Sequence, residues 1–170
     1  MKVLIAYSSK QGTTKKCADM LASKLGSAEV ELLDINESVP ASPENYDVVV
    51  LGSSVRFGAV SRNLKRYIKA HKSALNNMPS AVFLCCGYPD RFDEYVKDQF
   101  AKNFKPTYDF HCFGGELKPK QTKGFDRIIV AMARRSIVEH DFEDSSYEGS
   151  LPEILPESIS ILADTILKRR

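Results

Sequence analysis

The sequence has little that would place it in a specialised class of protein. Its 170 residues contain no apolar run approaching the ~20 residues that an α-helix needs to cross a bilayer. The apolar stretch after Met1 leads into polar residues and not into a cleavage site, so we interpret it as a first strand and expect a cytoplasmic protein. The sequence shows no repeat, linker or low-complexity tract, and we expect one domain over residues 1–170.

Several common signatures of metal and cofactor sites are also missing. The four cysteines and three histidines lack metal-ligand spacing, so we predict no metal site. The neighbours Cys85 and Cys86 would point to opposite faces of a strand, and we expect buried, reduced thiols. The pattern G-x-G-x-x-G and the Lys-Ser/Thr ending of a nucleoside triphosphate loop are absent, which disfavours dinucleotide and triphosphate sites of those kinds.

Short apolar runs alternate with amphipathic helical patterns along the chain. Strand-like runs recur at Lys2–Tyr7, Val30–Leu33, Asp47–Leu51, Ala81–Cys86 and about Tyr108–Phe113. Helical patterns occupy Thr14–Leu25, Leu64–Leu75 and Phe92–Phe104, and two further helices begin near Gly124 and at Pro156. Strands that alternate with helices indicate right-handed crossovers between parallel strands. We therefore predict an α/β fold with a doubly wound, five-stranded parallel sheet and helices on both faces.

The loop after the first predicted strand is rich in hydroxyl side chains. Residues 7–14 read YSSKQGTT, and the following helix begins at Thr13 or Thr14. The unpaired N–H groups and the positive dipole end of that helix would attract an anion. Hydroxyl groups of Ser9, Thr13 and Thr14 could complete a phosphate cage, and the alternative is a plain turn capped by Ser or Thr. A receiver domain has the same order of elements but is disfavoured, because serines stand where it needs acidic residues.

These residues resemble the fingerprint of the flavodoxins, in which a Ser/Thr-rich loop binds the phosphate of FMN. The resemblance implies that the phosphate is surrounded by Ser9, Lys10, Gln11, Gly12, Thr13 and Thr14. The stretch LGSSVRFGA at 51–59 is similar to the loop that covers one face of the flavin ring, and contributes Ser54, Val55, Arg56, Phe57 and Gly58. The stretch CCGYPDRFDEY at 85–95 is similar to the second ring-binding loop, and contributes Cys86, Gly87, Tyr88 and Asp90. Phe57 and Tyr88 are the aromatic candidates for ring contact, with ordinary packing as the alternative.

A narrower resemblance is to the flavodoxin-type, menaquinone-dependent protoporphyrinogen oxidases. It rests on GSSVRFG, NNMPSAVF and GGELKP in the order in which they occur here. The resemblance implies an FMN-dependent oxidoreductase that takes electrons from protoporphyrinogen IX and passes them to a quinone. This sequence lacks the long basic insertion that those enzymes carry after the fourth strand. An electron carrier that shuttles between redox partner proteins is therefore the alternative, and a flavin-binding module without turnover is a third class.

The distribution of charge favours an anionic substrate or an acidic partner. The net charge is only +2, yet the stretch from Arg56 to Lys72 holds six basic residues and no acidic one. Beside a flavin, Arg56 could pair with a substrate carboxylate or stabilise reduced, anionic FMN, and we select it as the catalytic candidate. The basic segment 117–136 could lie on an anionic membrane surface near a quinone, or it could cover the sheet. We thus expect peripheral contact with the inner face of the membrane as an option, and no nucleic-acid partner.

Overall fold

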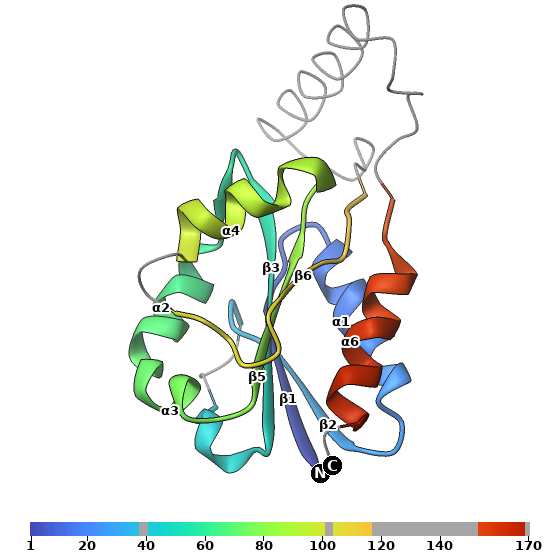
Figure 1. The fold of residues 1–170 in the computed structure, drawn as a ribbon. Helices are drawn as coiled ribbons and strands as arrows, with labels where there is room; N and C mark the ends of the chain where they lie inside the picture. The colour runs from blue at the N-terminus through green and yellow to red at the C-terminus, as the bar shows by residue number, and fades with distance from the viewer. Residues whose placement is uncertain (38–40, 101–103, 117–152, 169–170) are drawn as a thin grey trace, which may run out of the picture.

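The computed structural model describes residues 1–37, 41–100, 104–116 and 153–168. In this part of the chain, five parallel strands form a sheet in the order β2-β1-β3-β5-β6 (Figure 1). Their bounds are β1 Lys2–Ser8, β2 Glu29–Asp34, β3 Val48–Arg56, β5 Ser80–Cys85 and β6 Phe110–Cys112. A short strand, β4 Ala59–Val60, pairs antiparallel with the end of β3. The predicted five-stranded, doubly wound parallel sheet is confirmed, and its strand order is that of the flavodoxin-like fold.

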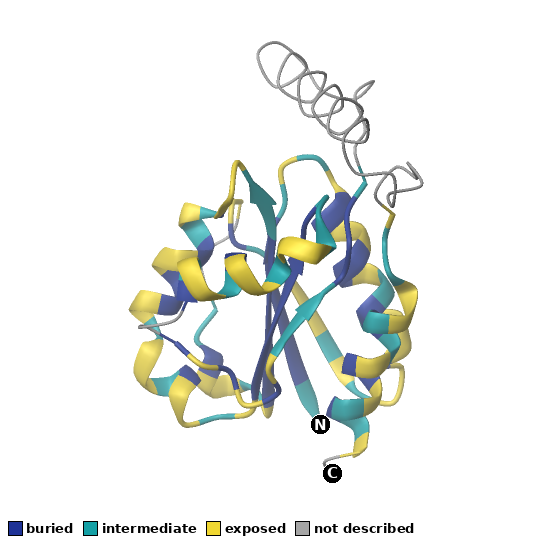
Figure 2. Cartoon of the chain, turned by 45° about the horizontal axis from the view of Figure 1, so that its top comes forward, coloured by how far each residue is buried: buried dark blue, intermediate teal, exposed yellow. Residues whose placement is uncertain are grey.

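Helices cover both faces of the sheet, as the sequence predicts. One face carries α1 (Thr13–Lys24) and α6 (Pro156–Lys168), and the other carries α2 (Arg62–Ala70), α3 (Lys72–Asn76) and α4 (Phe92–Phe100) (Figure 1). Two short 3-10 helices, η1 (Pro43–Asn45) and η2 (Pro89–Arg91), lie in the connections. Figure 2 shows the buried residues gathered in the strands between the two layers of helices.

The core follows from near-continuous apolar strands that alternate their side chains between the two faces. In β1, Val3 and Ile5 pack toward α1 and α6, whereas Leu4 and Ala6 pack toward α2 and α3, and all four are fully buried. Burying both faces of a strand in this way stabilises the fold by roughly 25 cal/mol for each Å² of apolar surface removed from water. The rigid sheet that results holds the loops at its carboxyl edge in fixed positions.

The structure differs from the predicted elements in three places. The predicted helix Leu64–Leu75 is two helices, because the backbone leaves helical geometry at His71, where φ is −112° and ψ is 20°. The third strand runs on to Arg56, so the predicted loop at 51–59 is a β-hairpin and not a loop. The last strand spans only Phe110–Cys112. Helix α4 is described over Phe92–Phe100, and the predicted continuation to Phe104 includes residues 101–103, which lie outside the described part of the chain.

Two predictions concern residues outside the described part of the chain. They are the helix expected near Gly124 and the basic segment 117–136, both within the undescribed range 117–152. Within the described residues, no helix combines the length and the apolar character needed to span a membrane.

Candidate functional site

The site is built where parallel strands end and the direction of winding changes. Strand β1 pairs with β2 on one side and with β3 on the other, so the segments after β1 and β3 leave a crevice between them at the carboxyl edge of the sheet. The segments that follow β5 and β6 reach the same edge. Ligands of open α/β sheets bind at such a switch point.

The loop after β1 is a tight turn that ends in a helix. Gly12 has φ of 87°, a left-handed conformation that favours glycine, and its N–H donates a 3.2 Å hydrogen bond to the Ser9 hydroxyl. The Gly12 carbonyl accepts a hydrogen bond from the N–H of Lys16 at 2.9 Å, which closes the first turn of α1. The loop therefore presents the first N–H groups of a twelve-residue helix at the crevice.

The N-terminus of α1 has the properties of an anion site. Its first turn contains no acidic residue, and the positive end of the helix dipole lies there. The Thr14 side chain is 1% exposed, and its hydroxyl has no oxygen or nitrogen hydrogen-bond partner among the described residues. This hydroxyl interacts with the Cys85 thiol behind the turn, and the backbone N–H groups of the first turn face the crevice, so the turn fits a phosphate group.

A network of polar side chains anchors this loop from below. The Asn36 amide donates to the Ser9 carbonyl at 3.1 Å, and its side-chain oxygen accepts from the Ser8 hydroxyl at 2.8 Å. The same oxygen accepts from the Asn63 amide of α2 at 2.9 Å. The Ser8 and Ser61 hydroxyls lie 2.7 Å apart, which links the loop to the N-cap of α2. The loop after β1 is thus held by the segment after β2 and by α2.

The hairpin of β3 and β4 forms a second wall of the crevice. At its tip, Phe57 has φ of 52° and Gly58 has φ of 72°, a pair of positive values typical of a type I′ turn. A bulky residue rarely adopts such a backbone, and Phe57 is also 72% exposed. The turn therefore leaves this aromatic side chain exposed at the edge of the crevice, where it is accessible to a ligand or partner.

The third wall comes from the segments after β5 and β6. Gly115 packs so closely that a Cβ atom there would lie 2.9 Å from the Cys86 carbonyl oxygen, so these two segments touch through their backbones. The Arg91 guanidinium lies 5.7 Å from the centre of the Tyr95 ring, and it also pairs with Glu94 at 2.9 Å. This side of the crevice therefore combines an aromatic surface with a cation.

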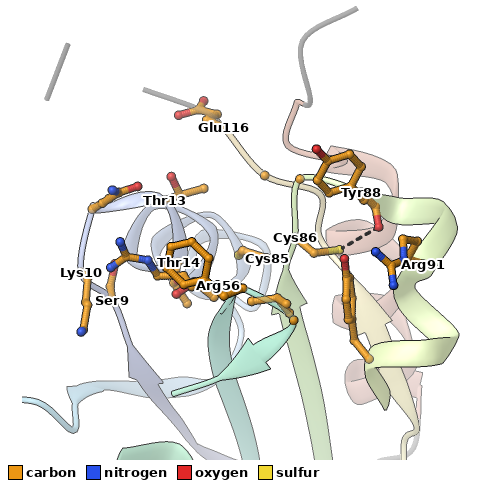
Figure 3. Close-up of a pocket in the computed structure, with 18 residues that line it drawn as sticks. Ser9, Lys10, Thr13, Thr14, Arg56, Cys85, Cys86, Tyr88, Arg91 and Glu116 are labelled. Carbon is orange, nitrogen blue, oxygen red and sulfur yellow. Dashed lines mark hydrogen bonds between the residues drawn. The ribbon is translucent and has the colours of Figure 1, made fainter. Parts of the chain in front are cut away.

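Together the three walls enclose a cavity of about 370 Å³, within the size range of small-molecule sites. In Figure 3, Ser9, Lys10 and Thr13 lie on one side of it, Tyr88 and Arg91 lie on the other, and Arg56 lies between them. The predicted site residues that line the cavity are Ser9, Lys10, Gln11, Thr13, Thr14, Ser54, Val55, Arg56, Phe57, Gly58, Cys86, Gly87 and Tyr88. Gly12 and Asp90 do not line it: Gly12 shapes the turn, and Asp90 is an exposed residue of η2.

Sequence reasoning missed five residues that also line the cavity, namely Cys85, Arg91, Tyr95, Gly115 and Glu116. Three of them, Cys85, Arg91 and Tyr95, belong to the same stretch 85–95 that supplied four predicted site residues. Their place at or just after the end of the fourth long strand could therefore have identified them. Gly115 and Glu116 follow the last strand of the sheet, and only the fold shows that this strand ends at the same edge.

Charge is distributed unevenly around the cavity. Lys10, Arg56 and Arg91 supply cationic groups to its lining, while Glu116 supplies a carboxylate. That carboxylate lies 2.7 Å from the ammonium group of Lys16 on α1, which offsets its charge near the phosphate end. Burial raises the pKa of Tyr95, so its hydroxyl stays protonated at neutral pH. The lining therefore favours an anionic ligand.

The residues present fit FMN. The turn at Ser9–Thr14 matches a phosphate, and the aromatic side chains of Phe57, Tyr88 and Tyr95, which also line the cavity, match a flat aromatic ring. The lining also includes the polar residues Gln11 and Ser54, which suit a hydroxylated linker.

Comparisons with known proteins agree with this geometry. Residues 4–144 match the family described as Flavodoxin domain. The protoporphyrinogen IX dehydrogenase [quinone] of Escherichia coli strain K12 is 35% identical, over 84% of this chain and 90% of that protein. The oxidised flavodoxin 1 of Bacillus cereus aligns with a TM-score of 0.50 at 21% identity, covering 82% of this chain and 99% of that one. The flavodoxin of Streptococcus pneumoniae TIGR4 aligns with a TM-score of 0.57 at 11% identity over the whole of both chains. The chain therefore belongs to the flavodoxin-domain family, and FMN is the cofactor that this membership implies.

Proposed function

We propose that this protein is an FMN-dependent oxidoreductase whose phosphate site is the turn Ser9–Thr14. The buried Thr14 hydroxyl and the absence of acidic residues from the first turn of α1 support the placement of the phosphate. The strained hairpin tip at Phe57 and the segment Cys86–Tyr88 would enclose the ring from two sides. When bound, FMN supplies the redox chemistry by accepting and returning two electrons, and the residues of this chain bind it, orient it and exclude water.

We further propose that the electron donor is protoporphyrinogen IX and that a quinone accepts the electrons. The observation that carries this proposal is the 35% identity to the E. coli dehydrogenase of that name over most of both chains. The cationic lining supports it, because Arg56 and Arg91 could pair with the carboxylates of an anionic substrate that approaches the ring end. Arg56, in the hairpin strand β3, is the residue we assign to substrate or flavin charge.

Electron carriage between redox partner proteins is the second candidate. It is favoured by the short connection after β5, where only three residues separate the end of the strand at Cys85 from the start of η2 at Pro89. That compact turn leaves the ring end open, and the exposed Phe57 beside it would meet a docking protein. In this case the basic residues of α2 would face an acidic partner surface.

An anaerobic mixing experiment distinguishes the two candidates. FMN-loaded protein is mixed with protoporphyrinogen IX, and the visible absorption of the flavin and of the porphyrin product is followed. Bleaching of the flavin with formation of porphyrin supports the dehydrogenase. Flavin that stays oxidised with the porphyrinogen, yet is reduced by a flavodoxin reductase, supports the carrier and contradicts the dehydrogenase.

A variant that removes the charge of Arg56 tests its role in the same experiment. The change Arg56→Gln should slow flavin reduction by protoporphyrinogen IX by roughly tenfold or more, because a charge-assisted hydrogen bond is worth about 1.5–3 kcal/mol. The matched control is Arg62→Gln, which removes an exposed cation of α2 that does not line the cavity. Equal rates for the two variants would remove Arg56 from the substrate site.

Peripheral contact with a membrane is proposed separately, since it depends on the basic segment 117–136. Replacing the six Lys and Arg residues of that segment with Gln should weaken binding to vesicles that contain an anionic phospholipid. Unchanged binding would reject this contact and would leave the proposed flavin site unaffected.

A further inference from the structure

Two cysteines from neighbouring strands lie together behind the ring end of the cavity. Cys86 directly follows β5, and Cys112 is the last residue of β6. Leu84 and Cys112 are register partners, so Cys86, two residues after Leu84, points to the same face of the sheet as Cys112. The two sulfur atoms are 3.5 Å apart. A disulfide requires about 2.05 Å, so they need only a small approach to bond.

We propose that Cys86 and Cys112 form a redox-active dithiol site, which closes to a disulfide by exchange with a small-molecule disulfide of the glutathione class. This site goes beyond the oxidoreductase activity proposed above. It requires no electron transfer through the flavin, because the oxidant is the incoming disulfide.

The two thiols differ in a way that gives each its own role. Cys112 is partly exposed, whereas Cys86 is only 2% exposed. A hydrogen bond from Cys86, aided by the N–H of Gly114, lowers the pKa of Cys112 to about 7. The hydrogen bond to Cys112 and burial raise the pKa of Cys86, and the charge of nearby Asp90 opposes ionisation of both thiols. Cys112 is thus the thiolate that attacks, and Cys86 is the thiol that resolves.

The exchange balances in two steps. The Cys112 thiolate attacks one sulfur of the disulfide R–S–S–R, forming a mixed disulfide and releasing one thiolate, R–S⁻. Cys86 then gives up its proton and attacks the Cys112 sulfur, which forms the Cys86–Cys112 bond and releases the second R–S⁻. The two protein thiols are oxidised and R–S–S–R is reduced to two thiols.

Closure of this disulfide would alter the wall of the cavity. Cys86 lines the cavity, and its sulfur lies 3.7 Å from the Tyr88 carbonyl oxygen, so the Cys86–Tyr88 segment follows any movement of that sulfur. The oxidised form should therefore bind FMN with a changed absorption spectrum. The other two cysteines, Cys17 of α1 and Cys85 of β5, share a hydrogen bond in the core and are 0% and 4% exposed, so they are less accessible to a dissolved oxidant than Cys112, although Cys85 also lines the cavity.

The test treats FMN-loaded protein with glutathione disulfide, blocks the remaining thiols with iodoacetamide and maps the cysteines by peptide mass spectrometry. We expect an intramolecular Cys86–Cys112 disulfide and a shifted flavin band, both reversed by excess glutathione. Cys86→Ser should instead hold glutathione as a stable mixed disulfide on Cys112. Cys112→Ser should leave Cys86 unreacted.

The matched control is Cys17→Ala, which removes the buried pair and should still form the Cys86–Cys112 bond. The flavin absorption of each variant shows that it is folded and loaded. The proposal is overturned if Cys112 remains fully alkylated after treatment, if the Cys86→Ser protein does not retain glutathione on Cys112, or if the bond found joins Cys17 and Cys85.

Discussion

The end of the cavity that we assign to the phosphate (the phosphate end) is made by one short stretch, Ser9–Thr14, whereas the end that we assign to the flavin ring (the ring end) is assembled from three segments that lie far apart in the sequence. The phosphate end is anchored by side-chain hydrogen bonds that reach Asn36 and α2. The ring end has a strained, exposed tip at Phe57. The phosphate end is therefore suited to a group that stays bound, and the ring end is accessible to substrates or partner proteins.

This difference predicts which end of the cavity determines the affinity for FMN and which determines the specificity for substrates or partners. A preorganised set of backbone N–H groups and hydroxyls binds an anion with little reorganisation, so the phosphate end should supply most of the affinity for FMN. Exposed aromatic and cationic groups select partners and substrates by contact, so the ring end should affect the reaction more than retention of the cofactor. The following variants test this division.

The largest effect is expected for Gly12→Val at the phosphate turn. A β-branched residue is strained at φ of 87°, although no atom lies within 4 Å of the added Cβ. The strain should cost about 2–3 kcal/mol, or roughly 30- to 150-fold in FMN affinity, measured by quenching of flavin fluorescence. Gly26→Val is the control, because Gly26 does not have positive φ and its added Cβ would make an ordinary 3.5 Å contact. Retained affinity in the Gly12 variant would contradict our placement of the phosphate.

An intermediate effect is expected for Asn36→Ala, which removes the anchor of the same loop. Asn36 bonds to the Ser9 carbonyl and to the side chains of Ser8 and Asn63, and losing these bonds should cost about 1–2 kcal/mol. We expect FMN to bind roughly 5- to 30-fold more weakly while riboflavin, which lacks the phosphate, binds as before. Asn77→Ala is the control, since among the described residues the Asn77 side chain donates a local hydrogen bond to the Ser73 carbonyl in α3. A parallel loss for both flavins would show that Asn36 acts on the fold and not on the phosphate loop.

A smaller effect on affinity is expected for Phe57→Asn at the hairpin tip. Asn tolerates positive φ, so the free energy of unfolding of the apoprotein should rise by about 1 kcal/mol in urea denaturation. Loss of the aromatic contact should weaken FMN binding by roughly threefold to tenfold. Ile161→Gln is the control, because Ile161 is an exposed apolar residue of α6 that does not line the cavity. Tighter or unchanged FMN binding would show that Phe57 serves something other than the flavin.

The smallest effect is expected for Lys16→Met, which breaks the contact between the two ends. The Lys16 and Glu116 side chains are 53% and 23% exposed, and a pair of this kind is worth about 0.2–1 kcal/mol. FMN affinity should fall by less than about fivefold at low salt, and the difference should shrink as salt is added. Lys15→Met, which breaks the exposed pair with Asp19 on the same helix, should have no such effect because neither residue lines the cavity. A larger loss would mean that Lys16 itself contacts the phosphate.

The sequence predicts the phosphate end better than the ring end, for a physical reason. A strand, a glycine turn and a helix N-terminus are local features, so YSSKQGTT carries nearly all the information for that end. Its anchor, Asn36, depends on the pairing of β1 with β2, which local patterns do not encode. At the ring end, continuous apolar residues predict β3, but its extension into a hairpin with β4 depends on cross-strand pairing.

Residues at the far edge of the sheet were the hardest to predict. Glu116 joins the cavity only because β6 lies next to β5, and the same pairing brings Cys112 to Cys86. The two strands are far apart in the sequence, and a single sequence does not give the register in which β5 and β6 pair. The cysteines were expected to be buried and reduced, and their spatial pairing comes from the fold alone.

The most direct test of the account compares the affinities of the apoprotein for FMN and riboflavin under the same conditions by fluorescence titration. The two ligands differ only in the phosphate, so the ratio of their dissociation constants isolates the turn Ser9–Thr14. The account predicts that FMN binds at least about 100-fold more tightly, as expected for two or more charge-assisted hydrogen bonds to the phosphate. Equal affinities would contradict it, because the turn would then contribute nothing to cofactor binding.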